Sequence, residues 1–71
     1  MNAYPVAIVP TNEFFEDLAW VYEGEALPEA GEEITVRAVE SLGGELLEES
    51  AVVVVSSVTD GEPFPITAAP L

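Results

Sequence analysis

The run Ala51-Val52-Val53-Val54-Val55-Ser56-Ser57-Val58 is the strongest strand signal in this chain of 71 residues. Valine is branched at Cβ and favours the extended backbone of a β-strand, and here it occupies both alternating faces of the segment. A strand that is apolar on both faces needs burial on both sides, because an exposed run of this kind promotes aggregation. The run therefore predicts a central strand in a sheet that is covered or closed.

The segment after the valine run is predicted to return as a neighbouring strand. Asp60-Gly61 favours a tight turn and is the best short-range hairpin signal in the sequence. Residues 63–68 then include Pro63 and Pro65, which lack the N–H group that a strand ladder needs. The returning segment is therefore predicted to be an edge strand.

Residues 33–40, upstream of the valine run, are predicted to form a half-buried strand with one wet face. Apolar and polar side chains alternate there, and the apolar set is Ile34, Val36 and Ala38. The preceding pattern, Pro28-x-x-Gly31-Glu32-x-Ile34-x-Val36, resembles the starts of strands in many small barrels. Residues 45–50 are expected to form a short acidic link that adds Leu46 and Leu47 to the core.

The segment before these strands admits two interpretations. Thr11 or Asn12 can cap a helix that runs to about Tyr22, with its apolar side chains on one broad face. The acidic residues of the opposite face are Glu13, Glu16 and Asp17. On this helix Trp20 falls within the acidic face and points to solvent. In the alternative, residues 18–22 form a strand and Trp20 belongs to the core.

The predicted fold is a small α+β domain that spans residues 1–71. It has about four mostly antiparallel strands, the first at residues 4–9, and one amphipathic helix near the N-terminus; an all-β, SH3-like barrel is the alternative. A domain of this size buries only about 60% of the surface that its unfolded chain exposes. With no cysteine and no histidine, it has neither disulfides nor the usual zinc ligands to compensate. Self-association or a bound partner is therefore expected.

Fourteen acidic residues and a single basic one, Arg37, give the chain a formal net charge of -13. Without lysine, histidine and cysteine it lacks the usual general bases, nucleophiles and transition-metal ligands. Paired carboxylates such as Glu32/Glu33 are expected to be solvated, and Arg37 is expected to form a surface ion pair with a cross-strand glutamate. We therefore expect no enzyme activity, no cofactor and no metal site.

The sequence shows no membrane or targeting signal. Its longest apolar run, residues 51–55, is far shorter than the roughly 20 residues that span a bilayer. Residues 3–9 are short and lack the positive flank of a signal peptide. An acidic surface is also repelled by anionic lipid. A cytoplasmic location is therefore expected, in the host if the chain is phage-encoded.

The charge predicts a partner of opposite sign. A compact array of carboxylates can dock on a basic protein surface and take the place of a nucleic-acid backbone. In size and charge the chain resembles DNA-mimic inhibitors, many of which phages and mobile elements encode. The predicted partner-binding residues are Glu13, Glu16, Asp17, Trp20 and Glu33. The alternatives are a virion or complex subunit that oligomerises through its valine-rich sheet, and a domain whose charge serves solubility alone.

Overall fold

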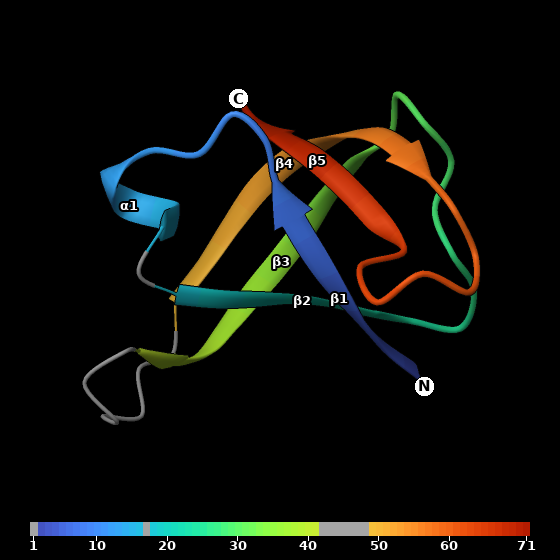
Figure 1. The fold of residues 1–71 in the computed structure, drawn as a ribbon, viewed down its shortest axis with the longest axis horizontal. Coiled ribbons are helices and arrows are strands. Elements are labelled where there is room, and N and C mark those ends of the chain that lie inside the picture. Colours follow the sequence, from blue (N-terminus) through green and yellow to red (C-terminus); the bar gives the residue numbers. More distant parts are fainter. Residues whose placement is uncertain (1, 17, 42–48) are drawn as a thin grey trace.

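The computed structural model describes residues 2–16, 18–41 and 49–71, and in these ranges the chain forms five strands and one short helix (Figure 1). In chain order the elements are β1 (Asn2–Ile8), α1 (Glu13–Glu16), β2 (Leu18–Gly24), β3 (Glu33–Ser41), β4 (Glu49–Val58) and β5 (Ile66–Pro70). The five strands close into a barrel in that order. This small, strand-dominated domain fits the all-β alternative better than the predicted α+β class.

Parallel pairing between β1 and β5 closes the barrel, whereas all consecutive strands pair antiparallel. The parallel closure follows from the odd number of strands, because strands that alternate in direction regain the starting direction at the fifth. The residue pairs of this closing seam are Val6–Ile66, Ala7–Thr67 and Ile8–Ala68. The N–H of Val9 extends the seam by donating a hydrogen bond of 2.8 Å to the carbonyl of Ala68.

The central position predicted for the valine run is confirmed, because β4 pairs with β3 on one side and with β5 on the other. Val53 and Val55 point into the barrel and are buried. The expected burial on both faces is wrong, however, because Val52 points outward and is 44% exposed. In a closed barrel the second face of a strand belongs to the outer wall, and no described element covers that wall over Val52.

The prediction that the returning segment is an edge strand is wrong. β5 pairs with β4 as the predicted hairpin partner and also with β1. Its prolines do not interrupt these ladders, because Pro63 and Pro65 precede the strand and Pro70 ends it. The turn signal is confirmed, since Gly61 adopts a φ of 91° in the connection between β4 and β5, a conformation that favours glycine.

The prediction of a helix that runs to Tyr22 is wrong beyond the first turn. Asn12 does cap α1, because its Oδ1 accepts hydrogen bonds from the N–H groups of Phe14 at 2.9 Å and Phe15 at 3.2 Å. The chain then enters β2, where Leu18, Trp20 and Tyr22 pack into or against the core. The alternative interpretation, a strand at residues 18–22, is therefore confirmed.

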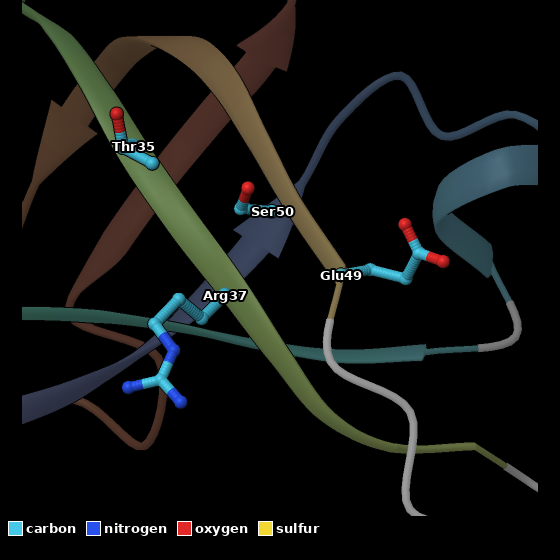
Figure 2. A pocket seen from close by; sticks show the side chains of 4 residues that line it. All are labelled: Thr35, Arg37, Glu49 and Ser50. Carbon is cyan, nitrogen blue, oxygen red and sulfur yellow. The ribbon is translucent and has the colours of Figure 1, made fainter.

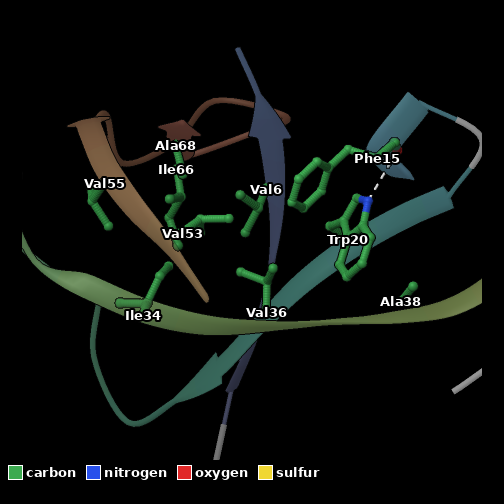
Figure 3. Close-up of a cluster of buried hydrophobic side chains, with 10 residues drawn as sticks. All are labelled: Val6, Phe15, Trp20, Ile34, Val36, Ala38, Val53, Val55, Ile66 and Ala68. Atoms are coloured by element: carbon green, nitrogen blue, oxygen red, sulfur yellow. Dashed lines mark hydrogen bonds between the residues drawn. The ribbon is translucent and has the colours of Figure 1, made fainter. Parts of the chain in front are cut away.

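A single apolar core fills the barrel (Figure 3). The inward positions predicted for β3 are confirmed, since all three apolar residues of its alternating set are buried. The buried core residues are Val6, Phe15, Trp20, Ile34, Val36, Ala38, Val53, Val55, Ile66 and Ala68. Leu46 and Leu47, expected as core anchors, lie outside the described residues.

The two ends of the barrel carry different connections (Figure 1). The β2–β3 and β4–β5 connections lie together at one end, where the N–H of Gly31 donates to the carbonyl of Val55 at 2.8 Å. At the opposite end, α1 lies beside the start of β2 and covers the core there with Phe15. The two ends therefore present separate surfaces to solvent.

Candidate functional site

Carboxylates dominate the surface of the barrel. All ten acidic residues with described side chains are exposed: Glu13, Glu16, Glu23, Glu25, Glu29, Glu32, Glu33, Glu49, Asp60 and Glu62. No charged side chain that the structure describes is buried. Nor do three or more of the described acidic side chains converge in a group that could hold a metal ion. The described carboxylates are thus spread over the surface, and an arrangement of this kind attracts cations over a wide area.

Arg37 forms the cross-strand ion pair that the sequence predicted. Its Nη1 donates a hydrogen bond to Oε1 of Glu23, and the two residues lie on neighbouring strands because Val21 of β2 pairs with Arg37 of β3. Both side chains are at least one third exposed, so the pair contributes about 0–1 kcal/mol to stability. The single basic side chain of the chain is thereby engaged with one of its own carboxylates.

Trp20 is not the exposed anchor that the helical interpretation predicted. Only 4% of its surface is exposed, and its indole Nε1–H donates a hydrogen bond of 3.0 Å to the carbonyl of Phe15 (Figure 3). The Phe15 ring lies 5.0 Å from the Trp20 ring, centroid to centroid. Trp20 therefore belongs to the core, and it cannot contact a partner directly.

Phe14 takes the exposed position that had been predicted for Trp20. It lies on α1 and is 48% exposed. Its ring centroid is 5.0 Å from that of Phe15, in an edge-to-face arrangement, and 5.6 Å from that of Trp20, in a tilted one, so the ring contacts two buried aromatic side chains. The helical wheel missed this residue because it placed Phe14 on the apolar face. Because the helix ends after one turn and a strand follows, Phe14 faces solvent and Trp20 is buried, the reverse of the arrangement on a continuous helix.

Three exposed carboxylates lie at the same end of the barrel as this ring (Figure 2). Glu13 and Glu16 are exposed on α1 itself. Glu49 reaches the same end through strand register, since Trp20 pairs with Ala38 and Ala38 with Glu49. Two strand spacings place the backbone of Glu49 about 10 Å from that of Trp20, and its carboxylate projects toward the side where α1 lies (Figure 2). We call Glu13, Phe14, Glu16 and Glu49 the α1 surface.

Of the two remaining predicted site residues, only Glu33 is described, and it does not join the α1 surface. Asp17 lies outside the described residues. Glu33 is exposed at the start of β3, whereas the start of β2 pairs with the other end of β3 through Leu18 and Ser41. Eight residues of extended chain separate Glu33 from Ser41, a distance of up to about 26 Å. Glu33 therefore belongs to the opposite end of the barrel.

A depression of about 370 Å³ lies on the outer wall over β3 and β4, lined by Thr35, Arg37, Glu49 and Ser50 (Figure 2). It is open to solvent. The Arg37 side chain points toward β2, where Glu23 accepts its hydrogen bond, while Glu49 points the other way. The polar groups of the depression therefore do not converge on one point, as those of a small-molecule site do.

A second exposed feature is apolar and lies on the outer wall of β4 and β5. The outward residues Val54 and Ala69 are paired across these strands, and Val52 and Leu71 continue the same outward alternation. Val52 is 44% and Leu71 74% exposed. We call Val52, Val54, Ala69 and Leu71 the β4–β5 outer face.

Comparison of the chain with protein-family models, with curated proteins and with solved structures finds no match. In the described part of the chain, no helix has the length and apolar character needed to cross a membrane. The α1 surface and the β4–β5 outer face thus have to be interpreted from their own chemistry.

Proposed function

We propose that this domain is a non-enzymatic binding module that engages a basic protein surface. The observation that carries the proposal is that every described carboxylate is exposed, while the one basic side chain is held by Glu23. Exposure alone is the ordinary state of a carboxylate, since burial is costly unless the group is paired, but the net charge of -13 exceeds the magnitude of about 2–8 that keeps a small domain in solution. Their net effect is a strongly negative field that accelerates encounter with a cationic surface.

The charge density of the domain supports the more specific proposal that this binding module is a nucleic-acid mimic. The domain extends 31 Å along its longest axis, and a duplex of that length carries about 18 backbone charges at one per ~1.7 Å. A net charge of -13 on this body is of comparable density. A protein surface that binds nucleic acid through lysine and arginine would therefore meet a similar charge on this domain.

Salt-dependent capture in the presence of competing DNA tests this function. Immobilised domain is incubated with cell lysate at low salt, and the retained proteins are eluted with a NaCl gradient or with duplex DNA. We expect mainly basic, nucleic-acid-binding proteins, released by both treatments because both compete for the same cationic groups. Retained proteins without a basic bias, or proteins that duplex DNA fails to displace, would contradict the mimic.

The exposed β4–β5 outer face supports a second candidate, a small assembly subunit that associates with copies of itself. Contact through this face would bury Val52 and Leu71, next to Glu33, which pairs with Val54 across β3 and β4. Sedimentation velocity over a concentration series tests it. Self-association that Val52→Asp abolishes, with the fold intact, would favour the assembly subunit, whereas a monomer at all concentrations would exclude association through this face.

A further inference from the structure

The α1 surface combines an exposed aromatic ring with carboxylates, and this combination specifies a partner more narrowly than charge does. We propose that the α1 surface binds a basic peptide segment that carries an apolar side chain among its lysine or arginine residues. The inference rests on the proposed function and names the chemistry of the partner at this one surface. The apolar side chain would pack on Phe14, and the cations would face Glu13, Glu16 and Glu49.

The Phe14 ring is a preformed contact for an apolar side chain. It is 48% exposed, yet it contacts the buried rings of Phe15 and Trp20 at centroid distances of 5.0 and 5.6 Å. The hydrogen bond from the Trp20 indole to the Phe15 carbonyl fixes these two supporting residues relative to each other. A ring that is already held in place loses little conformational freedom on binding, which is the property of an interface anchor.

The surrounding charge selects the partner. Glu13, Glu16 and Glu49 are all exposed, so cations placed next to them gain attraction without first breaking a buried pair. Nucleic acid, anionic lipid and a second copy of this chain, which carries the same carboxylates, would all be repelled. A cationic protein segment is the occupant whose charge is complementary to this surface.

Two capped synthetic peptides of equal charge test the inference, Lys-Lys-Leu-Lys-Lys and Lys-Lys-Ser-Lys-Lys. Binding is followed by ¹H–¹⁵N NMR, in which the indole N–H of Trp20, the single tryptophan, reports on the α1 surface. We expect the leucine peptide to bind about tenfold more tightly, the effect of ~1.4 kcal/mol, and to shift the indole signal. Phe14→Ala should abolish the preference. Phe64→Ala, which removes a comparably exposed ring from the β4–β5 connection, should preserve it.

A second pair of variants keeps the test decisive if Phe14→Ala does not fold. Two double variants change the net charge equally at opposite ends of the barrel: Glu13→Gln/Glu16→Gln and Glu29→Gln/Glu62→Gln. The first should weaken both peptides severalfold more than the second. Equal weakening by the two pairs, or equal affinity of the two peptides for the wild-type protein, would overturn the inference while leaving the proposed function in place. Failure of both peptides to bind at low salt would contradict both.

Discussion

The indole N–H of Trp20 donates a hydrogen bond of 3.0 Å to the main-chain carbonyl of Phe15, five residues earlier in the chain. This bond joins the single turn of α1 to the second strand of the barrel. It satisfies both the buried indole donor and a carbonyl at the end of a helix, which would otherwise lack a partner. The position of α1, and with it the exposure of Phe14, therefore depends on Trp20.

Replacing Trp20 with alanine is expected to destabilise the whole domain. The change removes a buried indole and leaves the Phe15 carbonyl without its donor, and large-to-small changes of this kind cost about 3–5 kcal/mol. Urea unfolding followed by far-UV circular dichroism measures the loss. The wild-type protein should also show the blue-shifted fluorescence of a buried indole. Solvent-exposed emission from the native protein would contradict the position of Trp20 in the core.

Aspartate at neighbouring positions of β4 should separate its two faces. Val53 is fully buried, and Val53→Asp would place an unpaired charge in the core at a cost of several kcal/mol, enough to unfold a small domain. Val52→Asp changes the outward face, so the fold should survive it. Thermal melts of both variants test this contrast, and two variants with equal stability would contradict the orientation of the strand.

The periodic part of this fold could be predicted from the sequence. Alternation at Ile34, Val36 and Ala38 indicated the inward face of β3, and Asn12 was one of two predicted helix caps. Both are local signals, because each depends on residues close together in the chain. Local pattern alone was enough for these elements.

The rest of the fold depends on contacts between distant residues. The apolar positions from Phe14 to Tyr22 fit a helix as well as a strand, and the choice follows from burial of Trp20 in the barrel. The closing seam pairs Val6 with Ile66, two segments with no local relationship. Glu49 reaches the α1 surface only through its pairing with Ala38. Sequence periodicity therefore could not predict that Phe14 is exposed or that Glu49 lies at the same end of the barrel.

Loss of the helix cap should have a small and local effect. Asn12 Oδ1 accepts hydrogen bonds from two N–H groups in the first turn of α1, and replacing such a cap with alanine costs about 0.5–2 kcal/mol. Asn12→Ala should therefore lower the melting temperature by several degrees, whereas Asn12→Ser or Asn12→Asp should preserve it. Hydrogen exchange of the Phe14 and Phe15 amides measures the local effect. A uniform increase in exchange across the barrel would contradict a role confined to α1.

Added salt should stabilise the native domain. The chain has a net charge of -13 on a body 31 Å long, and all of its described carboxylates are exposed. Many like charges therefore lie within the Debye length of about 30 Å at 0.01 M salt, which shortens to about 10 Å at 0.1 M. Screening relieves this repulsion in the folded state more than in the expanded chain.

Each kcal/mol of stability recovered by screening should raise the melting temperature by roughly 4–8 °C for a domain of this size. Melts in NaCl and in Na₂SO₄ at equal, low ionic strength should agree, because screening is set by ionic strength, whereas the exclusion of sulfate from the protein surface, which strengthens apolar burial, contributes little at low concentration. A melting temperature that stays flat or falls as NaCl is added would show that the carboxylates do not repel one another in the fold.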